Sequence, residues 1–336
     1  DWCMRDFKGE KMYAGNWDAV CINSPYRDYV YRQLKEIVSN YDIDGILLDI
    51  VGFHVDNKVA CYCDYCKRLF KAKFGGDIPV EPNWKSPLWV KFVLWRYDVM
   101  TSFLKEVSAL IKDIKTNLPF THNFAGSLTS WSVGQDIEDA SSVDDFLFAD
   151  IYWQREGTLC LSRNPRFYQS LSRGRPQTLI VRFLWPWDWM ISPKSLLMAE
   201  AMSGIANGNG VTFIDHHNFD GSLEERVYDI IGEVFNEVER REEWLMANEP
   251  ILYAALYFSQ SARDFYGRED PGKYNDGFDA TYKSLLEDHI IFSVIHDKYL
   301  NAEALAKFKV LVLPNAGCLT QDQIDEIREY VRSGGG

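Results

Sequence analysis

The chain has 336 residues, of which 46% are hydrophobic and 25% are charged, and this is enough apolar sequence for more than one domain. Its net charge of −13 argues against a nucleic acid or an anionic membrane as partner, because both require a basic face. The sequence also lacks the long apolar run that a membrane span needs. Aromatic residues make up 15% of the chain, which suits either a core or a site that places flat rings against sugars.

Short apolar runs alternate with amphipathic stretches through about residue 245, and this alternation predicts strands followed by helices. The expected helices span residues 23–40, 87–114 and 224–244. The expected strands span residues 17–22, 46–48, 118–122, 146–152, 178–183 and 211–214. Six such units predict an α/β fold of the (β/α)8 TIM-barrel type over residues 1–248. Because eight units close a barrel, we expect the missing N-terminal units to precede Asp1.

The pattern restarts after residue 248 and predicts a second domain over residues 249–336. Its expected strands span residues 251–258, 291–295 and 308–313, and its expected helices span residues 282–288 and 321–332. This is the pattern of a doubly wound, flavodoxin-like domain that is truncated at Gly336. A Gly-rich phosphate-binding motif is absent, so we expect no organic cofactor.

Three of the seven cysteines are crowded into residues 61–66, in the pattern C-x-C-x-x-C. This crowding favours metal-binding thiols in a reducing, cytoplasmic location over a framework of disulfides. A closed tetrahedral zinc site needs a fourth ligand. Cys21 is the preferred candidate, because it ends the preceding expected strand, and Cys3 and His54 are alternatives. A site of four cysteines has no open position, so its expected role is structural.

Acidic residues near strand ends are the candidate catalytic groups. Asp49 follows the apolar run at 46–48, Glu156 follows Tyr152 and Trp153, and Asp188 lies between two tryptophans. Hydrolysis of a glycoside needs two carboxyl groups, one that protonates the leaving oxygen and one that acts as nucleophile or base. Partial burial beside aromatic rings would suit Glu156 or Asp188 to the role of acid. Alternatively, Asp49 caps a helix or pairs with an arginine. The other acids in these regions are Glu200, Asp215 and Asp220.

Polar and aromatic side chains in the same strand-end loops are the candidate ligand contacts. His122 and Asn123 end the strand at 118–122 and suit the hydroxyl groups of a sugar. His216 and His217 do not predict a metal site, because adjacent residues of a strand point in opposite directions. The expected sugar-binding residues are His122, Asn123, Trp153, Trp185, Trp187 and Asp215.

Several segments resemble glycoside hydrolases. The segments NSPYRDY, YDIDGILLDI, CYCDYCKRLF and THNF resemble the barrel of the hypothetical glycosyl hydrolases that include family 151 α-L-fucosidases. The segment from EPILYAALYFSQSARDFYG to the C-terminus resembles the trimerisation domain of family 42 β-galactosidases. This resemblance implies a carbohydrate substrate and a homotrimer. It also implies the zinc cluster of family 42, whose ligands match Cys21, Cys61, Cys63 and Cys66.

The acidic residues depart from the family 42 pattern. That family has an Asn-Glu acid/base where this chain has Leu48 and Asp49, and no Glu follows the expected strand that ends at Phe183. An Asp in this place is similar to the nucleophile of family 29 α-L-fucosidases. The resemblance therefore implies a retaining α-L-fucosidase with Asp49 as nucleophile. The acid of those enzymes has no fixed motif, so the candidates remain Glu156 and Asp188, and a retaining mechanism places the acid roughly 5–5.5 Å from Asp49. A β-galactosidase, another exo-glycosidase, a sugar-binding barrel without catalysis and an assembly scaffold are the alternatives.

Overall fold

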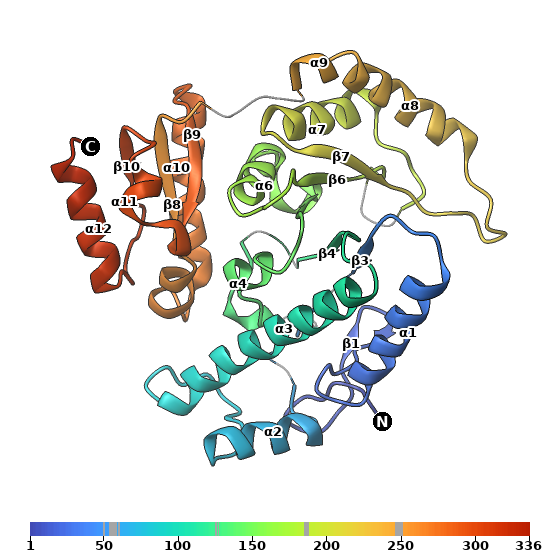
Figure 1. Cartoon of the computed structure of the whole chain (residues 1–336), viewed down its shortest axis with the longest axis vertical. Coiled ribbons are helices and arrows are strands. Elements are labelled where there is room, and N and C mark those ends of the chain that lie inside the picture. Colours follow the sequence, from blue (N-terminus) through green and yellow to red (C-terminus); the bar gives the residue numbers. More distant parts are fainter. Residues whose placement is uncertain are drawn as a thin grey trace. The chain divides into compact units, whose positions relative to one another are not determined.

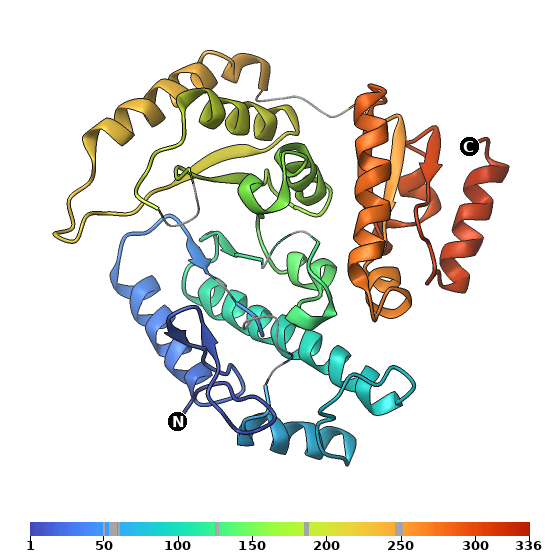
Figure 2. The same cartoon turned by 180° about the vertical axis from the view of Figure 1, so that it is seen from behind.

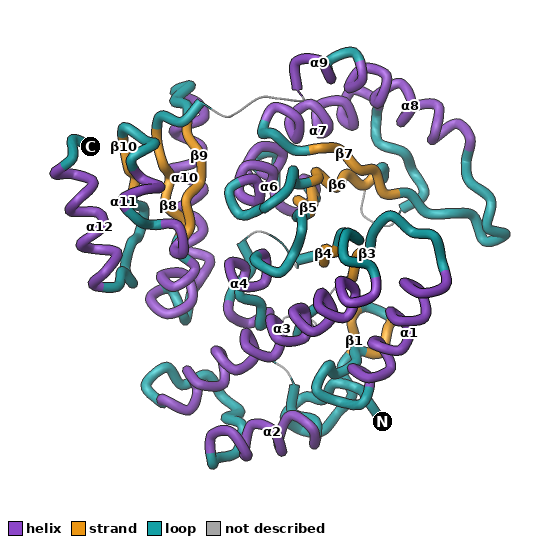
Figure 3. Tube along the Cα trace, viewed as in Figure 1, coloured by secondary structure: helices purple, strands orange, loops and turns teal. Residues whose placement is uncertain are grey.

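A computed structural model describes residues 1–49, 51–53, 59, 61–124, 126, 128–184, 188–245 and 251–336. The chain divides into two compact units, coloured along the sequence in Figure 1. The first unit comprises residues 1–145 and 263–272, and the second comprises residues 146–262 and 273–336. Helices and strands alternate in both units (Figure 3). No helix in the described part of the chain has the length and apolar character that a membrane span requires.

A parallel pair of strands lies at the centre of the first unit. Strand β3 (Ile46–Leu48) pairs with β4 (Phe120–His122), and Leu48 is opposite His122. The backbone N–H of Asn123 donates to the carbonyl of Leu48 at 2.9 Å, which extends the pairing by one residue. Both strands therefore end at the same edge, and this brings the next residue, Asp49, beside Asn123.

Two helices of the first unit follow the expected ranges closely. Helix α1 (Tyr26–Asn40) buries Val30, Leu34 and Val38, which are four residues apart and share one face. Helix α3 (Pro87–Ile114) begins with a proline, which is well tolerated there because the N–H groups of a first helical turn have no partner within the helix. Helix α3 packs on α1 (Figure 2). The remaining helices, which were not expected, are α2 (Asp64–Phe74), a 3-10 turn at Trp131–Val133, α4 (Ile137–Ser141) and a π-helical turn at Ala262–Tyr266.

The expected barrel strand at residues 17–22 is wrong. Strands β1 (Tyr13–Ala14) and β2 (Trp17–Asp18) instead form an antiparallel hairpin. Gly15 takes a positive φ of 61° in its two-residue turn, and such turns join antiparallel strands. Val20 makes an isolated antiparallel bridge to Cys3. Before residue 245, the described residues thus contain five parallel strands, β3 to β7, and not six.

The second unit contains a parallel sheet in the order β5-β6-β7. Its strands are β5 (Phe148–Ile151), β6 (Gln177–Val181) and β7 (Gly210–Ile214). Helix α7 (Lys194–Ala206) packs on β6 and β7, and α8 (Glu225–Glu239) packs on α7 (Figure 1). The apolar core between these layers consists of Ile180, Leu197, Ala201 and Val234, and all four are fully buried. The other helices are α5 (Trp153–Glu156), α6 (Cys160–Gln169) and α9 (Glu242–Leu245), so the helix expected at 224–244 is divided in two.

The C-terminal residues form a separate parallel sheet in the order β10-β8-β9. Side chains of β8 (Ala254–Phe258) alternate between its two faces. Phe258 packs on Phe278 of α10 (Pro271–Glu287), whereas Ala255 and Tyr257 pack with Tyr330 of α12 (Gln321–Arg332). This arrangement, with the first strand between the next two, is the order with which flavodoxin-like sheets begin. The elements are β8 (Ala254–Phe258), α10 (Pro271–Glu287), β9 (Phe292–His296), a 3-10 turn (Asp297–Tyr299), α11 (Ala302–Leu305), β10 (Val310–Val312) and α12 (Gln321–Arg332).

The C-terminal domain differs from the expectation at the start of its first helix. Helix α10 begins at Pro271 and not at residue 282, because the polar stretch before Tyr282 is also helical. Helix α12 has the expected range, and a capping box between Thr320 and Gln323 fixes its first turn. The expected domain boundary at residue 248 lies outside the described residues.

Candidate metal centre and strand-end sites

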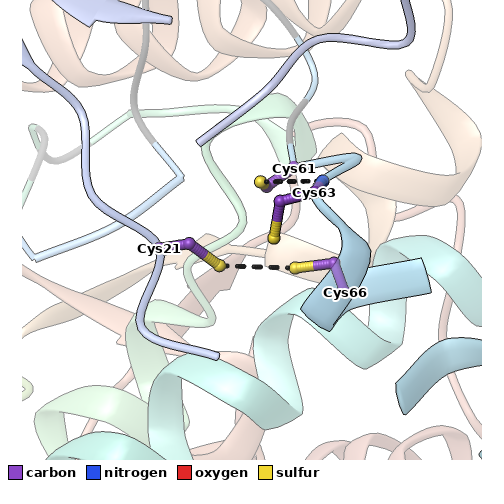
Figure 4. Close-up of side chains that lie close together, drawn as sticks. All are labelled: Cys21, Cys61, Cys63 and Cys66. Atoms are coloured by element: carbon purple, nitrogen blue, oxygen red, sulfur yellow. Dashed lines mark hydrogen bonds between the residues drawn. The ribbon is translucent and has the colours of Figure 1, made fainter. Parts of the chain in front are cut away.

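Four cysteines from two distant segments meet in the first unit (Figure 4). Their Sγ atoms all lie within 4.8 Å of one another, and the Sγ atoms of Cys21 and Cys66 are 3.4 Å apart. A tetrahedral zinc ion with Zn–S bonds of about 2.3 Å holds its sulfur atoms about 3.8 Å apart. The donor set therefore fits zinc without a large rearrangement. The four residues are Cys21, Cys61, Cys63 and Cys66, and all of them are buried.

N–H groups surround the sulfur atoms of this cluster. The backbone N–H of Arg5 donates to Cys61 Sγ at 3.2 Å, and the side-chain amide of Asn23 donates to Cys66 Sγ at 3.3 Å. Cys63 stands immediately before helix α2, where the helix dipole favours negative charge. Donors of this kind stabilise thiolates and orient metal ligands. The surroundings are thus those of a thiolate cluster.

The thiols also interact with one another electrostatically. Hydrogen bonds with Cys21 lower the pKa of Cys61 and of Cys63. A hydrogen bond with Cys61 raises the pKa of Cys21, and a hydrogen bond with Cys21 raises that of Cys66. Only some of these thiols therefore favour the thiolate form by themselves. A divalent metal would balance the charge of four thiolates, and its binding would release the remaining protons.

Of the two alternative fourth ligands, Cys3 is not in this cluster. Cys3 directs its sulfur at Asp18 Oδ2, at 3.8 Å, on the hairpin side of the N-terminal segment. His54 lies outside the described residues.

Asp49 is exposed at the end of β3 and has an amide neighbour. The Nδ2 atom of Asn123 donates to Asp49 Oδ1 at 3.0 Å. Asp49 makes no ion pair with any residue that the structure describes. The carboxyl end of a parallel strand is the place where α/β enzymes put their chemistry. An exposed carboxylate in this place, held by an amide, is available to a ligand.

His122, which precedes Asn123, is fully buried. Its Nδ1 lies 2.8 Å from Asp144 Oδ2 and 3.0 Å from Oδ1. Burial raises the pKa of Asp144, and the neighbouring imidazole partly opposes this increase. The His122 ring also contacts Phe124, with centroids 4.2 Å apart. This places His122 behind the strand-end surface, where it supports the backbone that presents Asn123.

Glu156 belongs to the second unit and is paired with an arginine. Arg163 makes an ion pair with the Oε2 atom of Glu156, and the amide of Asn164 donates to the same atom at 3.3 Å. The buried Arg163 also binds Asp279 of α10 at 2.6 Å. Arg163 thus holds two acids from different elements, as a structural ion pair does. The role of Glu156 as acid catalyst stays a prediction.

A buried ion pair joins the ends of β6 and β7. Arg182 Nε lies 2.5 Å from Asp215 Oδ1, and the same oxygen accepts the backbone N–H of His216 at 2.8 Å. Arg182 also donates to the carbonyl of Trp189 at 3.0 Å. The predicted ligand contact Asp215 therefore holds two strand-end loops together. A second predicted residue, Asp188, accepts the backbone N–H of Met190 at 3.0 Å.

Aromatic rings cover this end of the second sheet. The His216 ring lies 4.3 Å from the ring of Phe183 and 4.2 Å from that of Trp189, centroid to centroid. Trp189 lies 5.9 Å from Phe219, and these two side chains are 53% and 99% exposed. Sequence reasoning missed Phe219, although an isolated phenylalanine within the polar stretch 216–224 was a signal. Exposed rings at carboxyl strand ends suit contact with a sugar.

The other predicted aromatic contacts with the sugar are Trp153, Trp185 and Trp187. Trp153 begins α5, and its Nε1 is buried without a hydrogen-bond partner in the described part of the chain. Trp185 and Trp187 lie outside the described residues.

Comparison with known proteins supports a glycosidase fold. Residues 1–50 match the family described as hypothetical glycosyl hydrolase 6. The chain is similar to the solved structure of α-L-fucosidase isoenzyme 2 from Paenibacillus thiaminolyticus, with 23% identity and a TM-score of 0.75, over 99% of this chain and 48% of that one. A β-galactosidase from Bacillus circulans sp. alkalophilus is similar at 16% identity and a TM-score of 0.78, over 99% and 57%. A comparison with curated protein sequences found no match.

An exo-carrageenase from Bacteroides ovatus has a similar structure, with 12% identity and a TM-score of 0.68, over 97% of this chain and 54% of that one. Enzymes with three different named activities thus share this fold, so the fold does not decide the substrate. The chain spans about half the length of these structures. The predicted resemblance to glycosyl hydrolases is confirmed by the family match and by the shared fold. The chain therefore has the α/β fold of TIM-barrel glycosidases, and its first 50 residues match the sequence pattern of the hypothetical glycosyl hydrolase 6 family.

Proposed function

We propose that this protein is a retaining exo-glycosidase that acts on α-L-fucosides. The family match and the fold support a glycosidase. The observation that carries the finer proposal is Asp49, an exposed carboxylate at a carboxyl strand end with Asn123 beside it. A nucleophile in this position needs an approachable oxygen, and an ion pair would occupy that oxygen.

The proposed reaction has two steps. In the first, Asp49 attacks the anomeric carbon while the bond to the leaving oxygen breaks, and an acid protonates that oxygen. In the second, the same acid, now a base, removes a proton from water, and the water releases the sugar from Asp49 with its original configuration. Asn123 holds Oδ1 of Asp49, which orients Oδ2 for the attack. Glu156 and Asp188 are the candidates for the acid.

We also propose that the four-cysteine cluster binds a structural zinc ion. A bound zinc ion would crosslink the segment after the β1–β2 hairpin to the start of α2. Cys21, Cys61, Cys63 and Cys66 would fill its four positions, so the ion would take no part in hydrolysis.

We further propose a homotrimer that assembles through the C-terminal domain. This proposal depends on the resemblance of residues 249–336 to a trimerisation domain. Sedimentation of the full-length protein as a trimer would support the proposal, and sedimentation as a monomer would refute it.

The test of the catalytic proposal is hydrolysis of a panel of p-nitrophenyl glycosides by the full-length protein and by Asp49→Gly. We expect turnover of the α-L-fucoside and a loss of at least about 1,000-fold in kcat for the variant. Azide should partly restore activity to Asp49→Gly, because a small anion can take the place of a missing nucleophile. The matched control is Asp44→Gly, since Asp44 is an exposed acid at the other end of the same strand.

Other outcomes of this assay would contradict the substrate assignment or the role of Asp49. Turnover of the β-galactoside alone would replace the fucosidase assignment. Full activity of Asp49→Gly, or release of the sugar with inverted configuration, would remove Asp49 as nucleophile.

A further inference from the structure

A cavity of about 810 Å³ lies in the second unit, away from the strand ends described above. Its walls include the starts of β7 and β9 and the C-terminal ends of α6 and α7. It therefore opens at the amino-terminal ends of β6 and β7, whereas Arg182 and Asp215 follow their carboxyl ends. A strand of this length separates the two ends by roughly 17 Å. The volume of the cavity is in the usual range for binding sites of small molecules.

The cavity is positively charged in a protein of net charge −13. Arg166, Arg173 and Arg175 line it, against the single acidic lining residue Glu242 among those that the structure describes. None of the three arginines makes an ion pair within the described ranges of the chain. A concave surface with uncompensated guanidinium groups concentrates anions.

Two of the three arginines are held in place by other contacts. The guanidinium of Arg166 lies 4.3 Å from the centroid of the Phe292 ring. Arg175 donates to the carbonyl of Leu245 at 3.0 Å, and Arg173 is exposed. The contacts of Arg166 and Arg175 orient these two guanidinium groups without neutralising them, so their charge is available to a ligand.

Two asparagines add unsatisfied amide groups to the cavity wall. Asn209 is 2% exposed, and both polar atoms of its side chain lack a hydrogen-bond partner in the described part of the molecule. Asn207 donates to the carbonyl of Ser203 at 2.8 Å, but its Oδ1 is also buried without such a partner. Leaving buried amide groups unpaired is costly, so these groups favour a polar occupant. Amides can donate to and accept from hydroxyl groups.

We propose that this cavity binds a phosphorylated sugar. The guanidinium groups of Arg173 and Arg175 match the phosphate, since arginine forms paired hydrogen bonds to phosphate oxygens. The amides of Asn207 and Asn209 match the sugar hydroxyls. Because the site is at the amino-terminal ends of the strands, its ligand stabilises the fold or regulates the protein and takes no part in the chemistry. This proposal does not depend on the proposed glycosidase activity.

The test is isothermal titration of the full chain with glucose 6-phosphate, with glucose and with inorganic phosphate. We expect glucose 6-phosphate to bind at least about tenfold more tightly than either of the other two compounds. Arg173→Glu and Arg175→Glu should each weaken its binding by about tenfold or more. The matched control is Arg32→Glu, because Arg32 is an exposed arginine of α1 in the other unit and should leave binding unchanged.

The proposal is overturned if glucose 6-phosphate does not bind, or if inorganic phosphate or glucose binds equally well. It is also overturned if Arg32→Glu weakens binding as much as the cavity variants, since the general charge of the protein would then be responsible. If Arg173→Glu or Arg175→Glu alters the melting temperature of the free protein, Arg173→Gln and Arg175→Gln are used instead. We expect these variants also to weaken the binding of glucose 6-phosphate, but by less.

Discussion

Asp49 and Asp215 each follow the carboxyl end of a parallel strand, but the two aspartates have opposite surroundings. Asp49 follows β3 in the first unit and is exposed, with an amide from Asn123 as neighbour. Asp215 follows β7 in the second unit and is buried against Arg182. The same local pattern, an apolar strand and then an acid, thus yields one carboxylate that a ligand can reach and one that binds two loops together. The difference lies in the partner that the neighbouring strand supplies.

The largest expected effect comes from Asp215→Asn. This change leaves the guanidinium of Arg182 buried without its counter-charge, which costs about 3–5 kcal/mol of the free energy of unfolding. The equivalent change at the exposed end, Asp49→Asn, should cost less than about 0.5 kcal/mol. Urea denaturation of both variants makes the comparison. Equal losses in the two variants would show that the two strand ends do not differ in this way.

The second effect concerns the four-cysteine cluster, whose Cys61 follows Asp49 in the sequence. We expect about one zinc ion per chain by elemental analysis, and Cys66→Ser should lose it. At a free zinc concentration of about a hundred times Kd, bound zinc contributes about 2.7 kcal/mol to stability, which a chelator should remove. Cys3→Ser is the control, because the sulfur of Cys3 faces Asp18 and should be dispensable. A chain that retains its full stability in the chelator would contradict a structural zinc site.

A third effect belongs to the second unit, where Glu200 is buried in α7. Burial raises its pKa to about 8, from an ordinary value of 4.5. Between these two values the folded chain holds a proton that the unfolded chain has released, so stability falls as pH rises, by up to about 1.4 kcal/mol per unit. Below about pH 4.5 the contribution of Glu200 is constant. Glu200→Gln should remove this slope.

Denaturation of the wild type and of Glu200→Gln at pH 5.5 and pH 8 measures the effect. The variant should gain stability relative to the wild type at the higher pH. An identical loss of stability between the two pH values in both proteins would show that Glu200 is not the group responsible.

The alternating pattern of residues predicted most of the fold, because apolar periodicity reports directly which face of an element is buried. The range of α3 was predicted in full, and β6 and β7 are each within two residues of the expected bounds. The hairpin at residues 13–18 was missed, since its pairing depends on a turn at Gly15 and not on periodicity. The start of α10 was missed because Pro271 to Asp276 is polar and contains glycine.

Predictions for the site succeeded less evenly than predictions for the fold. The C-x-C-x-x-C spacing identified three of four clustered thiols, because a short segment fixes their separation. The environment of each acid was not predictable, since Arg163 and Arg182 come from other positions along the chain. A strand-end acid and its partner are joined by tertiary structure, and this information is not contained in the local sequence.

The smallest expected effect concerns the exposed rings of Trp189 and Phe219, near the strand end where Arg182 and Asp215 are paired. If this end of the second unit contacts the sugar through Trp189 and Phe219, then Phe219→Ala removes about 1 kcal/mol of binding, or about fivefold in KM, with little change in kcat. Trp244→Ala is the matched control, because Trp244 is 65% exposed on α9 and has no such ring neighbours among those described. The glycosidase assay with the α-L-fucoside provides the measurement. An equal change in both variants would assign the effect to general surface hydrophobicity, and no change in KM for Phe219→Ala would remove these rings from the sugar site. Since Phe219 is nearly fully exposed, its loss should not alter folding, so a change in KM reports on ligand contact alone.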